Sequence, residues 1–172
     1  QTTMTLQKLP TLLGASILAS LSPSFAATTL SVGDISIIGY SSDGVDQFSF
    51  VSWVDLDADT TINFTDRGWR NTAGEFTKNP SENPATSGLV ASDGNASWSP
   101  GVAVTAGTLI TATIQNNNPD TLVWSVGISS GDFGHTGLSS GGESIFAYQG
   151  SPSSPSLVFG LYYDQTSWDI AQ

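Results

Sequence analysis

The sequence contains no cysteine and only one histidine, His135. A disulfide framework, a thiolate metal site and a cysteine nucleophile are therefore excluded, as is a metal site built from several histidines. A Ser–His–Asp arrangement would have to use His135, yet the chain has no GxSxG motif and glycines lie close to this residue. These absences predict a protein that is not an enzyme.

Positive charge is also scarce: four Lys and Arg residues stand against fifteen Asp and Glu residues, for a formal net charge of −11. Nucleic-acid binding is excluded because it needs cationic side chains to displace counterions from phosphates. The same charge disfavours docking on anionic membranes and favours solubility and the binding of cations. No block of like charges occurs, which argues against a disordered chain.

A long hydrophobic run is missing as well, because crossing a bilayer takes about 20 apolar residues. The longest run, Leu9 to Leu21, follows the cation Lys8 and precedes Pro23. Small residues at Ser24 and Ala26 then suit the −3 and −1 positions of a cleavage site. The pattern predicts a helical signal peptide over residues 1–26, a secreted or cell-surface location and a mature chain without a membrane span.

Past residue 26 the apolar residues recur with a period of two rather than 3.6, as in β-strands. Seven such segments are separated by Gly, Pro, Asn and Asp: DISIIGY, DQFSFVSWV, TTINFT, GTLITATI, TLVWSVGI, ESIFAYQG and SLVFGLYY. This pattern predicts an all-β fold, an antiparallel β-sandwich preceded by the signal-peptide helix. We expect residues 27–172 to form a single domain that is truncated at its C-terminus.

The alternation predicts which side chains face the core. The residues expected to be buried are Phe50, Ile62, Ile110, Trp124 and Phe146, and those expected to be exposed are Thr61, Thr111 and Thr113. In the first segment, Ile35 and Ile37 should share one face and Ile38 and Tyr40 the other. The segment TLVWSVGI should form one continuous strand.

Four aspartates fall within twelve residues of the segment VDLDADTTINFTDRGW. Asp55, Asp57, Asp59 and Asp66 occupy positions 1, 3, 5 and 12 of an EF-hand-like loop. Position 6, however, is Thr60 where the loop needs Gly, and position 12 is Asp where it needs the longer Glu. Two interpretations stay open: a polar turn between strands, and a weak Ca²⁺ site, with Ca²⁺ the only cofactor that the sequence suggests.

Two tryptophans, Trp69 and Trp98, flank a long polar region that is rich in Asn, Pro, Gly and Ser, residues 70–95. A loop of this length inside a compact domain is usually functional or mobile. The two rings are candidates to present a flat surface to a sugar or a peptide, while core packing is the alternative. The partner is unknown, with a surface polysaccharide or a protein as candidates.

The stretch VGDISIIGYSSDGVDQFSFVSWVDLDADTTINFTDRGW, with VTAGTLITATI and GGESIFAYQG further along, resembles a group of secreted bacterial domains. These domains are common in cyanobacteria and marine proteobacteria, and the resemblance covers roughly residues 31–163. It implies a lamin-tail-like or immunoglobulin-like β-sandwich without assigned catalytic residues. Such domains occur in surface proteins, some with a PEP-CTERM sorting tag, and sometimes beside secreted hydrolases.

Two functions are therefore expected. The first is an exported, non-enzymatic surface, matrix or adhesion module. The alternative is the N-terminal accessory domain of a larger secreted hydrolase. Fold analogy alone does not decide between them.

Overall fold

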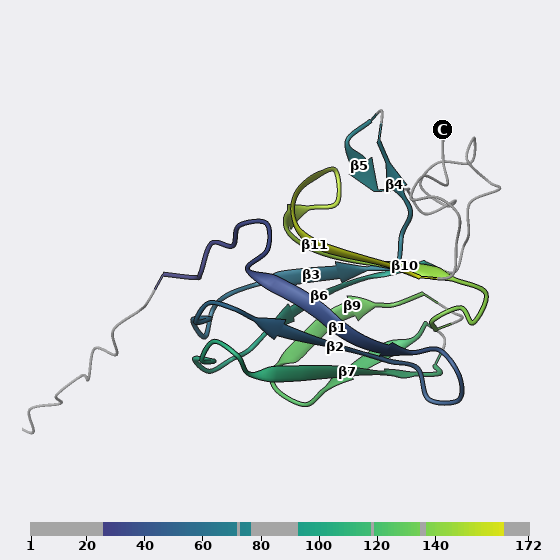
Figure 1. Cartoon of the computed structure of the whole chain (residues 1–172), viewed down its shortest axis with the longest axis horizontal. Helices are drawn as coiled ribbons and strands as arrows, with labels where there is room; N and C mark the ends of the chain where they lie inside the picture. Colours follow the sequence, from purple (N-terminus) through teal and green to yellow (C-terminus); the bar gives the residue numbers. More distant parts are fainter. Residues whose placement is uncertain (1–25, 72, 77–92, 118, 135–136, 164–172) are drawn as a thin grey trace, which may run out of the picture.

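A computed structural model describes residues 26–71, 73–76, 93–117, 119–134 and 137–163 (Figure 1). The predicted signal peptide, except Ala26, and His135 lie outside these residues. Among the described residues, no helix has the length and apolar character needed to span a membrane.

The described strands form two packed antiparallel sheets, which confirms the predicted all-β architecture (Figure 1). The four-stranded sheet has the order β1 (Ile35–Ser41), β2 (Gln47–Ser52), β7 (Leu109–Gln115) and β8 (Thr121–Trp124). The five-stranded sheet has the order β11 (Ser154–Tyr163), β10 (Glu143–Ser151), β3 (Ile62–Thr65), β6 (Asn95–Ser99) and β9 (Ile128–Asp132). A separate hairpin consists of β4 (Trp69–Arg70) and β5 (Glu75–Phe76).

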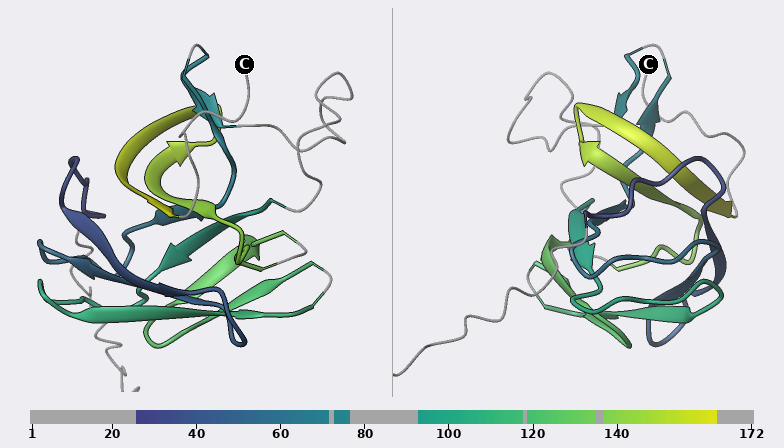
Figure 2. Two further views of the ribbon diagram at one scale, coloured as in Figure 1. Left: turned by 45° about the vertical axis from the view of Figure 1, so that its right-hand side comes forward. Right: turned by 90° about the vertical axis from the view of Figure 1, so that its left-hand side faces the viewer.

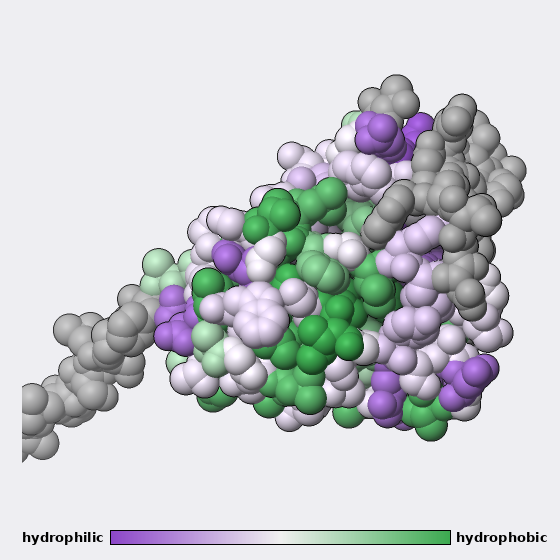
Figure 3. Space-filling view, in the orientation of Figure 1, coloured by the Kyte–Doolittle hydropathy of each residue, from purple (hydrophilic) through white to green (hydrophobic). Residues whose placement is uncertain are grey.

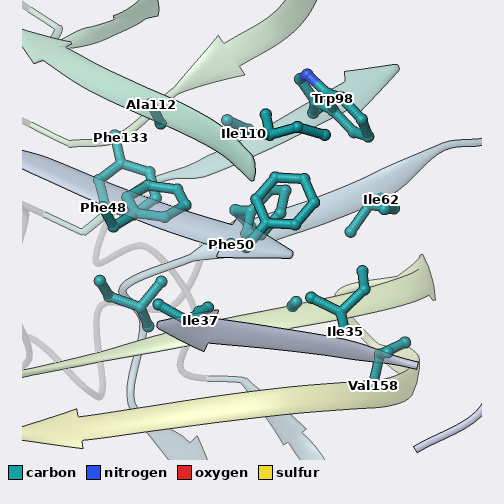
Figure 4. Packing of buried hydrophobic residues seen from close by; sticks show 14 of the residues in the cluster. Ile35, Ile37, Phe48, Phe50, Ile62, Trp98, Ile110, Ala112, Phe133 and Val158 are labelled. Atoms are coloured by element: carbon teal, nitrogen blue, oxygen red, sulfur yellow. The ribbon is translucent and has the colours of Figure 1, made fainter. Parts of the chain in front are cut away.

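The core lies between the two sheets, where aromatic rings from both layers meet (Figure 4). Phe50 on β2 packs against Phe64 on β3 with ring centroids 5.1 Å apart, and against Trp98 on β6 at 5.3 Å in an edge-to-face arrangement. Of the residues expected to be buried, Phe50, Ile62, Ile110 and Phe146 are buried, whereas Trp124 is only partly so. Thr61 is exposed as expected, but Thr111 and Thr113 are half-buried because β7 lies inside its sheet, flanked by β2 and β8.

A β-bulge on β1 changes the faces that its side chains occupy. Ile37 pairs with Phe50, but the next pair joins Gly39 to Ser49, so that Ile38 is an extra residue. Ile38 is exposed, whereas Ile35 and Ile37 share the core face as predicted. Tyr40, however, lies after the bulge and stacks on Tyr163 of β11, with ring centroids 3.9 Å apart. The prediction that Ile38 and Tyr40 share a face is therefore wrong.

The segment predicted as one strand around Trp124 is two strands, because the chain passes there from one sheet to the other. Gly127 forms the corner with a φ of 83°, a conformation that side chains with a Cβ rarely adopt. A Cβ on Gly127 would lie 2.6 Å from Nε1 of Trp98, whose N–H donates to the carbonyl of Val126 at 2.9 Å. Ile128 consequently begins β9 and is exposed.

A second, smaller core lies on the outer side of the five-stranded sheet. Phe146 and Tyr148 are buried there rather than between the sheets, and the hairpin β4–β5 covers them. Phe76 of this hairpin lies 4.9 Å from the ring of Tyr148, and Trp69 packs beside it. Figure 2 shows the hairpin projecting from the five-stranded sheet, near β10 and β11. In β10, Ile145 and the residues in phase with it face the main core instead.

Candidate functional site

Three of the four aspartates of the EF-hand-like segment lie in the connection between β2 and β3, each in its own environment. Oδ1 of Asp55 accepts the N–H of Ala106 at 2.8 Å. Oδ2 of Asp57 accepts the hydroxyl of Thr28 at 3.3 Å, and its carbonyl accepts the N–H of Thr60 at 3.0 Å. Asp59 is exposed. These contacts are those of aspartates that stabilise a turn.

The fourth, Asp66, lies at the opposite end of β3 and is fully buried. The four residues of β3 alone span about 13 Å, at about 3.3 Å per residue. Among the described residues, no three Asp, Glu or His side chains form a group that could hold a metal ion. The arrangement therefore favours the turn interpretation over a Ca²⁺ site.

Calcium should accordingly have no specific effect on thermal stability. We expect millimolar Ca²⁺ to leave the melting temperature where a control of equal ionic strength leaves it. Asp57→Asn should change the free energy of unfolding by less than about 0.5 kcal/mol. A bound ion would instead stabilise the fold by about 2.7 kcal/mol at a hundredfold excess over Kd. A calcium-specific shift in melting temperature that Asp57→Asn abolishes would contradict the turn interpretation.

The two tryptophans do not come together. Trp98 is completely buried in the main core, so core packing is the interpretation that the structure supports for this residue. Trp69 is half-buried on the outer side of the five-stranded sheet, where it meets Phe76 edge-to-face with ring centroids 5.2 Å apart. Trp98 is therefore not available for the flat contact surface that the sequence suggested, whereas contact of the half-buried Trp69 with a ligand stays a prediction.

A group of carboxyl side chains, which sequence reasoning missed, gathers where β3, β6 and β10 meet. Burial raises the pKa of Asp66 well above its usual value, the negative charge of Asp93 raises it further, and the N–H of Gly94 partly offsets both. Burial likewise raises the pKa of Glu143 to about 7, with Asp93 again adding to the effect. We call Asp66, Asp93 and Glu143 the acidic end. Within it, Glu143 can hold a proton near neutral pH.

Backbone packing holds the acidic end in place. Gly94 donates its N–H to Oδ1 of Asp66 at 2.7 Å, and its carbonyl accepts the hydroxyl of Thr65 at 2.5 Å. A Cβ on Gly94 would lie 2.3 Å from the nitrogen of Gly134, so only glycine fits between these segments. Beside them the hydroxyl of Tyr148 donates to Oδ1 of Asn95. These bonds run between backbone and side chains of the fold itself, which indicates a structural role.

Two further carboxylates accept backbone N–H groups of Gly137 and Leu138, which lie between β9 and β10. Oδ2 of Asp120 accepts the N–H of Gly137 at 2.8 Å, and Oδ2 of Asp46 accepts the N–H of Leu138 at 2.9 Å. Asp120 is buried, and its Oδ1 has no hydrogen-bond partner. The two aspartates thus join loops from both sheets through neighbouring backbone groups.

The four-stranded sheet presents a surface of a different kind. Its four strands contain no Asp, Glu, Lys or Arg, although the chain carries fifteen acidic residues. The side chains that alternate with the core residues point outward, and four of them are large, apolar and more than half exposed: Ile38, Trp53, Leu109 and Val123. The outward residues are Ser36, Ile38, Gln47, Ser49, Val51, Trp53, Leu109, Thr111, Thr113, Gln115, Thr121, Val123 and Ser125, of which Val51 is itself buried.

We call this set the uncharged face. Figure 3 shows hydrophobic side chains gathered in the middle of the side that carries β1 and β2, with the most hydrophilic ones toward the ends of the molecule. Exposed apolar patches on soluble proteins commonly mark interaction sites. The sequence carried a signal for it, because the polar positions of these strands are filled by Ser, Thr and Gln and never by a charged residue.

Comparisons with known proteins give no independent assignment. Neither models of protein families, nor curated proteins, nor solved structures match this chain. The function therefore has to be argued from the chain's own residues.

Proposed function

We propose that this protein is an exported, non-enzymatic surface, matrix or adhesion module that contacts its surroundings through the uncharged face. The observation that carries the proposal is the contrast between a net charge of −11 and a sheet surface without a single charged side chain. A surface that only had to stay in water would gain solubility from charge. Four large exposed apolar side chains at this place suit contact with another surface.

Export is supported by the cation, apolar run and small residues of the segment 1–26. The finer assignment of the fold, as lamin-tail-like or immunoglobulin-like, is supported by the motifs between residues 31 and 163 and by the two packed antiparallel sheets. Because domains of that kind occur in surface proteins, the resemblance supports a location on the cell surface. A module attached to a secreted hydrolase would use the same face to bring its enzyme to a target.

A non-catalytic role is supported by the way the chain uses its titratable groups. Asp66 accepts a backbone N–H inside the fold. The hydroxyl of Tyr163, whose pKa burial raises, donates to the carbonyl of Ser139 at 3.2 Å. A substrate would have to displace structural contacts to reach either group.

The test is retention of labelled mature protein on cells of the organism that produces it. Val123→Asp places a charge on the uncharged face and should reduce retention by about tenfold or more. Binding would bury this charge without a partner, which costs more than the about 1.4 kcal/mol that corresponds to a tenfold change in affinity. Val32→Asp is the matched control, because Val32 is exposed beside the edge strand β11, outside the uncharged face. Equal retention of the two variants, or no retention of the unaltered protein, would contradict the proposal.

A further inference from the structure

The uncharged face has a size that limits what can occupy it. Neighbouring strands lie about 4.8 Å apart and residues about 3.3 Å apart along a strand, so four strands of this length offer about 400 Å². A stable dimer of two copies needs about 800 Å² from each partner. Stacking of two copies through this face would therefore fall in the range of weak contacts, and it would bring together two chains that each carry a formal charge of −11.

Charge limits the occupant further. An anionic polymer would be repelled by the net charge and would find no Lys or Arg on the face. An ordinary protein surface carries many charged side chains, and these would lose water against the face without gaining a partner. A neutral, hydroxyl-rich polymer brings neither problem.

The polar groups of the face are arranged to accept such a polymer. Oγ of Ser49 and Oγ1 of Thr111 lie 2.8 Å apart across β2 and β7 and share one hydrogen bond. Two hydroxyls carry two protons, so one proton and several lone pairs of this pair remain available to a ligand. Directly after the neighbouring strand β8, Oγ of Ser125 accepts the N–H of Thr111 at 2.9 Å, which leaves its own proton free to donate.

Trp53 provides an apolar platform at one end of the face. Its indole N–H donates to Oγ of Ser36 on the neighbouring strand at 2.9 Å, which satisfies the polar edge of the ring and fixes its position. More than half of the side chain remains exposed. A fixed aromatic ring of this kind can stack on the C–H side of a sugar ring. The hydroxyls of Ser49 and Thr111 lie four residues farther along the sheet, about 13 Å away at about 3.3 Å per residue, where they can bond to other sugar units of the same polymer.

We propose that the uncharged face binds an extended neutral polysaccharide, with Trp53 stacking on a sugar ring and Ser49, Thr111 and Ser125 bonding to its hydroxyls. This inference rests on the proposed function for its choice of surface, and it adds the chemical class of the partner.

The experiment is affinity electrophoresis of the mature protein in gels that contain a soluble neutral β-glucan, mannan or galactan, with alginate as the anionic comparison. We expect retardation by at least one neutral polysaccharide and none by alginate. Trp53→Ala should weaken this binding by about tenfold or more, because the substitution removes the aromatic ring on which the sugar stacks. Val32→Asp should bind as the unaltered protein does, and the melting temperature of each variant shows that it is folded.

Parallel retention assays on producing cells separate this inference from the proposed function. Loss of retention after periodate oxidation of the cell-surface glycans supports the polysaccharide. Retention that survives periodate but is lost after protease treatment of the cells overturns the polysaccharide and leaves an adhesion module that binds protein. Retardation by alginate alone, or equal retardation of Trp53→Ala, also overturns the inference. Retardation by a neutral polysaccharide without retention on cells would support the inference and contradict the proposed function.

Discussion

Replacing Phe50 with alanine should lower the free energy of unfolding by about 3–5 kcal/mol. The side chain is completely buried between the sheets and packs against Phe64 and Trp98, with Trp124 slightly farther away at 6.2 Å. Its removal costs the transfer free energy of the ring and leaves a cavity that rigid aromatic neighbours cannot close. Chemical denaturation monitored by tryptophan fluorescence would measure the effect.

Leu109→Ala is the control for this prediction, because Leu109 lies on β7 beside the buried Ile110 but points out of the sheet. About half of its surface is already exposed, so its truncation should cost less than about 1 kcal/mol. Similar losses for the two variants would mean that the two faces of the four-stranded sheet are assigned incorrectly.

Raising the pH from about 4.5 to about 7 should destabilise the protein through the acidic end. Glu143 titrates near 4.5 in the unfolded chain and near 7 in the fold, so in this interval the folded state holds more protons. Stability therefore falls as the pH rises through the interval. Each unit of pKa difference corresponds to about 1.4 kcal/mol, so the loss of stability from Glu143 is at most about 3 kcal/mol. Solvent screens the charge of this partly buried side chain and makes the loss smaller.

The surroundings of Glu143 act in the same direction. Asp66 follows β3 and Asp93 precedes β6, and the negative charges of their carboxyl groups repel each other. The raised pKa of Asp66 adds to the loss of stability with rising pH. Tyr163 at the end of β11 does not titrate in this interval, because the ordinary pKa of tyrosine is already about 10, and burial and the charge of Glu143 raise it further.

Glu143→Gln separates this effect from the general repulsion of an acidic chain. The variant keeps the size of the side chain and removes its titration, so its stability should vary less between pH 4.5 and 7, while the contribution of Asp66 remains. Asp59→Asn removes one negative charge from an exposed turn and should keep the pH dependence of the unaltered protein. Melting temperatures across this interval would show the difference, and a pH profile unchanged by Glu143→Gln would contradict the assignment.

The sequence by itself determined the strand pattern. Period-two alternation places Phe48 and Phe50 on one side of β2 because successive side chains of a strand point to opposite faces, whatever the rest of the fold does. The same local rule correctly placed Ile35 and Ile37 on one face and Thr61 in solvent. The sequence also shows that four strands lack charged residues. Only their pairing into one sheet, however, combines their outward side chains into a single uncharged surface.

Only the tertiary structure decided the features that depend on residues far apart in the chain. The bulge at Ile38 turns Tyr40 toward Tyr163, and the corner at Gly127 is fixed by Trp98, two contacts that no local pattern contains. Likewise, Asp66 belongs to the acidic end because long-range pairing buries it beside Gly94, not because of its spacing from Asp55. Alternation in the sequence indicates which side of a strand is apolar. Whether a polar group is buried depends instead on which other segments cover the strand, and tertiary packing determines those segments.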